Sequence, residues 1–172
     1  MLHERAVHWL VNQLFLDCDG VLADFDTAAE RLLHMGPREA EARLGTKAFW
    51  SRLRNHKDFY SHLPLMHDAM RLFDAVAHLD PIILTGCPMG GWAEQQKVDW
   101  AARHFPGVKI ITCRSREKCQ FLQNPGDILV DDYLKFQHLW EEAGGVFVHH
   151  HSAQQSLERL AELGLPVGKL IT

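Results

Sequence analysis

Short apolar runs alternate with amphipathic segments along most of the chain. Five runs have the length and apolar character of buried strands, at residues 13–17, 81–85, 108–112, 127–131 and 145–149. Each of the last four is followed by a segment with helical spacing of apolar residues, at 92–104, 115–123, 133–143 and 152–163. Ser115 is the expected N-cap of the second helix, and Gly144 and Gly164 are expected to stop the last two. This alternation predicts an α/β fold in which crossover helices join parallel strands.

The segment 25–66 breaks the alternation. It contains several short helical patterns, interrupted by Gly36-Pro37 and Gly45-Thr46, and no run typical of a strand. We therefore predict a small helical cap at residues 25–66, inserted after the first strand of an α/β core at residues 1–24 and 67–172. A chain of 172 residues, 47% of them hydrophobic, suits one core with such an insert.

Charge and hydropathy narrow the class of partner. The formal net charge is −4 and the sequence has no run of Lys and Arg, which argues against binding to a nucleic-acid polymer. No apolar stretch reaches the roughly 18 residues of a membrane span. The apolar stretch at 6–16 is interrupted by His8, Asn12 and Gln13, so we expect a first strand there and not a signal peptide.

The four cysteines, at positions 18, 87, 113 and 119, lack CxxC spacing and the pattern of a disulfide-rich domain. Reduced thiols in a cytoplasmic protein are the simplest interpretation, and no zinc site is expected. We interpret Cys18 and Cys87 as small buried apolar residues without a chemical role. The histidines at 149–151 are interpreted as a solvated loop after a strand.

The first predicted strand delivers two carboxylates two residues apart into a glycine. Alternate strand residues share a face, so Asp17 and Asp19 can point into one site while Cys18 points away. Two buried anions are costly unless a metal ion, a proton or reaction chemistry compensates. Asp17 and Asp19 are therefore candidates for chemistry.

Other predicted strands end in polar residues of complementary types. Thr85-Gly86 ends the second strand, Asp131-Asp132 ends the fourth, and Lys118 lies in the first turn of a predicted helix. In a parallel α/β sheet, functional residues gather at the carboxyl ends of the strands. Acids there can hold a divalent cation, and a hydroxyl, a lysine and amides beside glycines can hold phosphate oxygens.

The chain resembles the haloacid-dehalogenase-like phosphohydrolases in four features. They are DxDGV from Asp17, the apolar run ending in Thr85, Lys118 and the acid pair Asp131-Asp132. More narrowly, DxDGVLADF, a Phe-Trp pair in the helical insert, R-x-K and GDILVDD are similar to the 5'(3')-deoxyribonucleotidases. The chain departs from that narrower pattern at Gly86, where a serine is expected, and at Tyr133, where an arginine is usual.

The resemblance implies a Mg²⁺-dependent phosphomonoesterase that acts through an aspartyl-phosphate, with a nucleoside monophosphate as the favoured small-molecule substrate. Asp17 would be the nucleophile, and Asp19 the general acid and then the base. Mg²⁺ would be bound by the Asp17 carboxylate, the Asp19 backbone carbonyl and Asp132, with Asp131 behind it. The expected phosphate ligands are Thr85, Lys118 and the amides near Gly20 and Gly86.

Several alternatives remain open at this point. Lys97 rivals Lys118 for the phosphate contact, and Phe25, Phe49 and Trp50 either recognise substrate or form the core of the cap. The substrate could instead be another small phosphate ester. A second class of function is a non-catalytic binding module that keeps the same fold.

Overall fold

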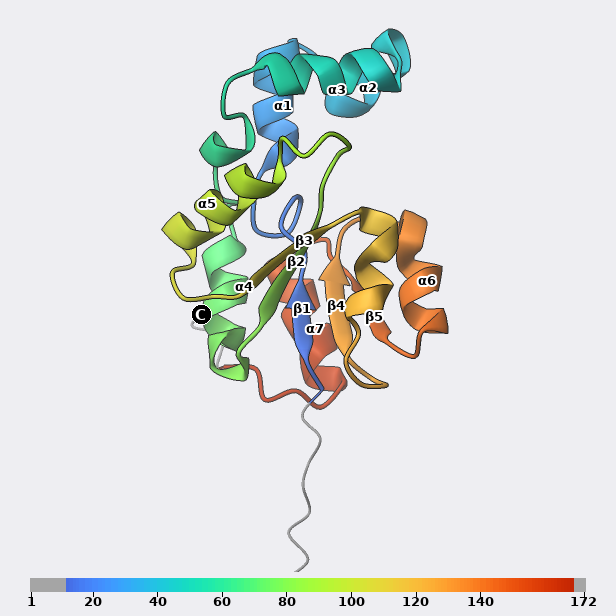
Figure 1. Ribbon diagram of the computed structural model, residues 1–172. Helices are drawn as coiled ribbons and strands as arrows, with labels where there is room; N and C mark the ends of the chain where they lie inside the picture. The colour runs from blue at the N-terminus through green and yellow to red at the C-terminus, as the bar shows by residue number, and fades with distance from the viewer. Residues whose placement is uncertain (1–11, 169–172) are drawn as a thin grey trace, which may run out of the picture.

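The computed structural model describes residues 12–168 and is built around one five-stranded, all-parallel sheet (Figure 1). The strand order β3-β2-β1-β4-β5 places the first strand at the centre of the sheet. The strands are β1 Leu14–Leu16, β2 Ile82–Gly86, β3 Ile110–Cys113, β4 Ile128–Asp131 and β5 Val146–His149. Each lies within two residues of a predicted run, which confirms the α/β fold. Residues 6–11, part of the expected first strand, lie outside the described residues.

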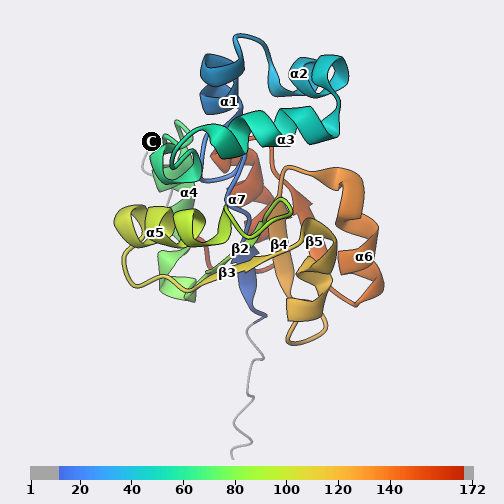
Figure 2. The ribbon, with the colours of Figure 1, turned by 45° about the horizontal axis from the view of Figure 1, so that its top comes forward.

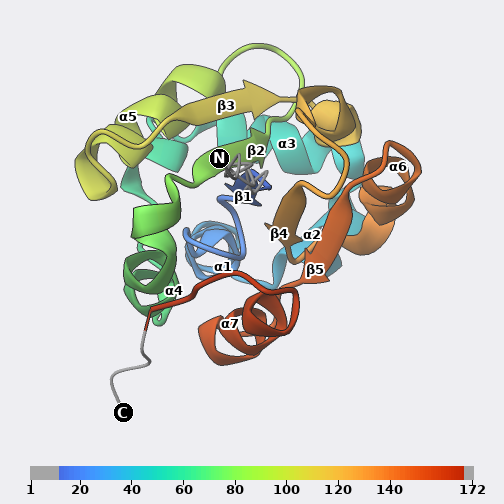
Figure 3. The same cartoon turned by 90° about the horizontal axis from the view of Figure 1, so that it is seen from below.

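Helices cover both faces of the sheet, as Figure 3 shows. Side chains alternate across β1, so Leu14 and Leu16 join the larger core and Phe15 joins the smaller one. In the smaller core Phe15 meets Trp140 edge to face, with ring centroids 5.4 Å apart. Helices that contribute to the larger core include α4 Ala69–Val76, α5 Glu94–His104 and α7 Ala153–Glu162. On the other face, α6 Gln137–Glu142 carries Trp140.

The segment between β1 and α4 is helical and lies beyond the carboxyl ends of the strands (Figures 1 and 2). Asp24 begins this segment by accepting a 3.0 Å hydrogen bond from the Thr27 amide, which caps the first helix. Its helices are α1 Phe25–Leu33, α2 Pro37–Leu44, α3 Thr46–Asn55 and the 3₁₀ turn η1 Tyr60–His62. All four fall within residues 25–66, and their role as a cap domain stays a prediction.

The predicted α-helix at 115–123 is wrong in type and in its cap. The segment forms a 3₁₀ helix, η3 Ser115–Phe121, and its N-cap is Arg114 instead of Ser115. The Asp127 carboxylate accepts hydrogen bonds from the amides of Gln123 and Asn124, at 2.7 and 2.9 Å. These bonds draw the chain into a turn before β4, so the helix ends early.

The predicted helix at 133–143 is divided, because the Tyr133 amide donates to Asp131 Oδ1 at 2.9 Å and keeps the chain in a turn after β4. A 3₁₀ turn, η4 Leu134–Phe136, therefore precedes α6. The helix α4, with the 3₁₀ turn η2 Ala77–Leu79 at its end, was not among the predicted elements. Within residues 12–168, no helix has both the length and the hydropathy needed to cross a bilayer.

Candidate active site

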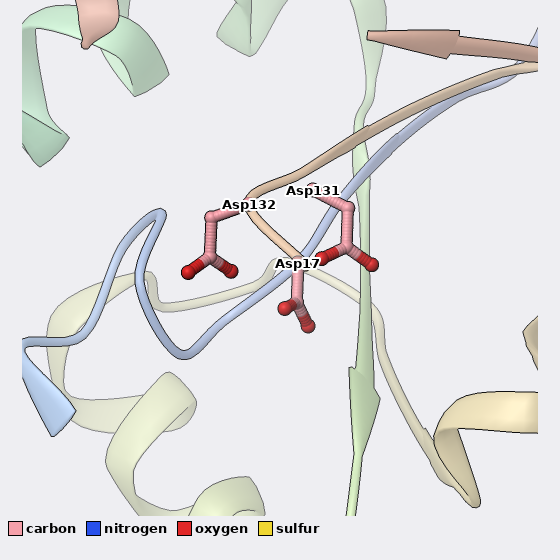
Figure 4. A group of neighbouring side chains, drawn as sticks. All are labelled: Asp17, Asp131 and Asp132. Carbon is pink, nitrogen blue, oxygen red and sulfur yellow. The ribbon is translucent and has the colours of Figure 1, made fainter. Parts of the chain in front are cut away.

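Three carboxylates converge where the central strands β1 and β4 end (Figure 4). The two strands pair in parallel with Leu16 opposite Val130, and the Asp17 amide donates to Val130 O at 2.9 Å. This register places Asp17 beside the acid pair that ends β4. One oxygen from each of Asp17, Asp131 and Asp132 lies within 4.8 Å of the others.

Lys118 lies between two of these acids. Its Nζ is 2.8 Å from Asp17 Oδ1, an ion pair that lacks hydrogen-bond geometry, and it donates to Asp131 Oδ2 at 2.7 Å. Burial by itself lowers the pKa of Lys118, but the charges of Asp17 and Asp131 outweigh burial and raise that pKa above its ordinary value. Lys118 is therefore a buried, permanently charged ammonium beside the candidate nucleophile.

Asp132 lies against Gly20, which explains the glycine. The backbone of Gly20 has φ of +77°, and a Cβ placed there would overlap Asp132 Oδ2 and lie 2.7 Å from Oδ1. The Gly20 amide, expected to hold a phosphoryl oxygen, instead donates to Ala23 O at 2.9 Å. In this structure Gly20 makes room for the Asp132 carboxylate.

Asp19 turns away from the three-acid group and pairs with Lys97, a fully buried residue of α5. Lys97 Nζ donates to Asp19 Oδ2 at 2.6 Å, to Thr85 Oγ1 at 2.9 Å and to Gly86 O at 2.9 Å. An ammonium has three N–H donors, so all of them are engaged. Burial raises the pKa of Asp19, and the Lys97 charge offsets part of that rise.

The two lysines therefore differ in what they can still bind. Lys97 has no donor left for a phosphoryl oxygen, whereas Lys118 donates one hydrogen bond, to Asp131, and faces Asp17 as an ion pair. Thr85 is fully buried with its hydroxyl against Lys97. The sequence carried a signal for the buried lysine, since Lys97 shares a helical stripe with the apolar Ala93, Trp100 and Ala101.

The donor set of the three-acid group fits a hard divalent cation. Burial and the Asp17 charge raise the pKa of Asp131 above its ordinary value, and burial together with the charges of Asp17 and Asp131 raises that of Asp132 to about 7. Asp132 is exposed as a residue, but its carboxylate is packed among the other acids and Gly20. Lys118 compensates only part of the negative charge of these three acids, and a group of oxygen ligands with remaining negative charge suits Mg²⁺.

Asp131 and Asp132, at the end of β4, differ in whether their carboxylate oxygens are already hydrogen-bonded. Both oxygens of Asp131 are engaged, Oδ2 by Lys118 and Oδ1 by the Tyr133 amide. Among the side-chain hydrogen bonds found within residues 12–168, none from another residue reaches the Asp132 carboxylate. This difference favours Asp132 as the direct ligand of a cation.

An aromatic cluster connects the helical segment to the site. The Phe25 ring stacks on the Tyr60 ring with centroids 6.0 Å apart, and its centroid lies 6.2 Å from that of Trp50. The centroid of the Tyr60 ring lies 4.6 Å from Lys97 Nζ. Phe49 is only 2% exposed and belongs to the core, whereas Phe25 and Trp50 are half-buried. Tyr60, next to Phe59 in the sequence, is a contact that the sequence analysis did not single out.

The cysteines and histidines around the site add no second group of metal ligands within residues 12–168. Cys18 and Cys87 are buried free thiols, and burial raises the pKa of both, to about 11 for Cys87. His149 is half-buried, with Nε2 3.2 Å from Asp132 O, and His150 is buried against Ser156 Oγ at 2.8 Å. The histidine segment is thus partly packed against the core, although we expected a solvated loop.

Comparisons with known proteins support the fold. No family model and no curated protein matches the sequence. Among solved structures, the crystal structure of a hydrolase from Streptococcus pneumoniae TIGR4 is similar, with a TM-score of 0.50 and 12% identity over 90% of this chain and 98% of that chain. This likeness places the chain among α/β proteins with a parallel, Rossmann-like sheet, a fold that it shares with a hydrolase.

Proposed function

We propose that this protein is a Mg²⁺-dependent phosphomonoesterase of the haloacid-dehalogenase-like type. The observation that carries the proposal is the separation of two carboxylates at one strand end. Asp17 lies beside the Lys118 ammonium and two further acids. Asp19, two residues later, is outside this group and is paired with Lys97. A nucleophile and a general acid need such different surroundings to hold different protonation states at one pH.

Asp17 is the nucleophile in this proposal. Its carboxylate oxygen attacks phosphorus, the bond from phosphorus to the ester oxygen breaks, and an aspartyl-phosphate forms. Lys118, 2.8 Å from Asp17 Oδ1, reduces the repulsion between the carboxylate and the phosphate dianion. Asp17, Asp132 and the Asp19 backbone carbonyl would hold Mg²⁺, which would supply further neutralising charge when bound.

Asp19 is the general acid and then the base. Its raised pKa favours the protonated form that donates a proton to the departing alkoxide. The resulting carboxylate then takes a proton from water as that water attacks the aspartyl-phosphate, which releases phosphate and restores Asp17. Lys97 fixes Asp19 through a 2.6 Å hydrogen bond, so the acid keeps one orientation in both half-reactions.

A nucleoside monophosphate is the favoured substrate, and another small phosphate ester is the alternative. The support is the half-buried pair Phe25 and Trp50, which continues through Tyr60 to Lys97 beside Asp19. Aromatic faces bind planar bases by stacking without demanding a particular hydrogen-bond pattern.

The test is phosphate release from a panel of ribonucleotides, deoxyribonucleotides, sugar phosphates and an aryl phosphate, with Mg²⁺ present. The unmodified protein and Asp74→Asn, a control at an exposed aspartate of α4, should turn over at least one ester. Asp17→Asn should retain the fold and lose at least about a hundredfold in rate, because an amide is a poor nucleophile. Absence of turnover across the panel would favour a non-catalytic binding module.

A further inference from the structure

The Ser115 side chain occupies the space directly above Gly86. A Cβ built on Gly86 would overlap Ser115 Oγ and lie 3.0 Å from its Cβ and 3.2 Å from its Cα. Gly86 ends β2 at the edge of the sheet where the candidate site lies, and Ser115 begins η3. The hydroxyl of one element thus fills the side-chain position of the other.

The 3₁₀ form of η3 aligns Ser115 with Lys118. Residues three apart eclipse one another in a 3₁₀ helix, so the two side chains lie on the same side of η3. Lys118 on that side reaches Asp17 and Asp131. Ser115, Lys118 and Asp131 also line one small cavity, whose other walls are mainly apolar residues of the smaller core. The hydroxyl and the ammonium are therefore directed toward one region.

The Ser115 hydroxyl is not used to stabilise its own helix. Arg114 is the N-cap, and its backbone amide donates a hydrogen bond to Glu117 Oε2 at 3.3 Å. None of the side-chain hydrogen bonds found within residues 12–168 uses Ser115 Oγ, and Ser115 is half-buried, so a ligand can reach it. Thr85, by contrast, is fully buried with its hydroxyl against Lys97.

Two backbone amides near the expected phosphate position are already engaged. The Gly20 amide donates to Ala23 O and the Cys87 amide donates to Cys113 O at 2.7 Å, so neither is free. Lys97 has no N–H donor left. A phosphate monoester presents three non-bridging oxygens to its site, so groups besides Lys118 must donate to them.

We infer that Ser115 is a phosphate-binding residue, whose Oγ donates a hydrogen bond to a non-bridging phosphoryl oxygen beside Lys118. This inference rests on the proposed phosphomonoesterase activity and adds a ligand that the sequence analysis had assigned to helix capping. Gly86 is the complementary part of the arrangement, since any larger residue would displace the Ser115 side chain. The hydroxyl can be supplied from position 115 or from position 86, but not from both.

The experiment measures inhibition by inorganic phosphate and the KM for the best substrate. Ser115→Ala should weaken both by roughly tenfold, the equivalent of about 1.4 kcal/mol for one hydrogen bond to a charged group. Ser51→Ala, a control at an exposed serine of α3, should change neither. Melting temperatures of both variants should stay close to that of the unmodified protein, because Ser115 Oγ makes no hydrogen bond within the described residues.

Moving the hydroxyl from position 115 to position 86 distinguishes a role in phosphate binding from a role in packing. Gly86→Ser alone should be impaired, because its side chain meets Ser115. Combining Gly86→Ser with Ser115→Gly opens the space and returns a hydroxyl to it from β2, and should recover most of the phosphate affinity that Ser115→Gly alone loses. Equal affinity in that double variant and in Ser115→Gly would overturn the inference.

The two proposals fail in different ways. Hydrolysis by the unmodified protein with an unchanged KM and phosphate inhibition in Ser115→Ala would remove Ser115 from the site and leave the phosphomonoesterase standing. No hydrolysis and no phosphate binding by the unmodified protein would refute the phosphomonoesterase, and the role of Ser115 with it.

Discussion

Lys97 Nζ and Asp19 Oδ2 are joined by a 2.6 Å hydrogen bond between residues 78 positions apart in the chain. The same ammonium donates to the Thr85 hydroxyl and the Gly86 carbonyl, and the Tyr60 ring lies 4.6 Å from it. One buried lysine therefore connects the end of β1, the end of β2 and the helical segment. In the proposed mechanism, Lys97 orients Asp19, the general acid.

Lys97→Met should disturb the acid step more than the nucleophilic step. Loss of the cation raises the pKa of Asp19 further, so the alkaline limb of kcat/KM for an alkyl phosphate should shift to higher pH. The rate of Lys97→Met with that ester should fall by about tenfold or more, and its rate with an activated aryl phosphate should fall by less. Asp19→Asn should show the same dependence on the leaving group. Lys118→Met should impair both esters alike. Identical pH profiles for Lys97→Met and the unmodified protein would contradict the assignment.

Removal of the metal should abolish activity, because the negative charges of the three acids would then repel the phosphate of the substrate. Activity should return with Mg²⁺ and not with Ca²⁺, which accepts more ligands and looser geometry. Asp132→Asn should raise the Mg²⁺ concentration for half-maximal activity more than Asp131→Asn does, because both Asp131 oxygens are already engaged. The opposite ranking would exchange the roles of the two acids.

The stability of the metal-free protein should depend on pH through Asp132. Its pKa is about 7 in the folded protein, well above that of an unfolded aspartate, so the folded state binds more protons between these values. Stability without metal should therefore fall as pH rises from about 4 to about 7. Melting temperatures should show a weaker fall in Asp132→Asn, and added Mg²⁺ should stabilise the unmodified protein most at the higher pH. Identical pH dependence in the two proteins would argue against a shifted Asp132.

Trp50 should contribute to the choice of substrate. Trp50→Ala should lower kcat/KM for a nucleoside monophosphate by roughly tenfold or more, about 1.4 kcal/mol, and barely affect an ester too small to reach the cap. Phe49→Leu is the matched comparison, because Phe49 is buried and its truncation should lower the melting temperature without changing preference. Equal losses for large and small esters would place Trp50 in the cap core.

The sequence by itself determined the α/β fold and the edge of the sheet where the chemistry is expected. Apolar runs of strand length, alternating with helical patterns, indicate a parallel sheet covered by helices. Asp17 and Asp131 follow such runs directly, so parallel strands are sufficient to bring both to the same edge of the sheet. Their contact also requires β1 and β4 to be neighbours, which the strand order provides. Local pattern and a general rule of sheets were sufficient for the shared edge.

The tertiary structure alone decided which polar groups satisfy one another. The sequence marks Lys97 as part of an apolar helical stripe but does not assign partners to either lysine. Packing engages all three donors of Lys97 and places Lys118 beside Asp17. The Ser115 side chain lies against Gly86, and η3 ends before hydrogen bonds that the Gln123 and Asn124 amides donate to Asp127. These outcomes depend on distances between side chains far apart in sequence, and burial makes each unpaired polar group costly, so the whole fold selects the pairs.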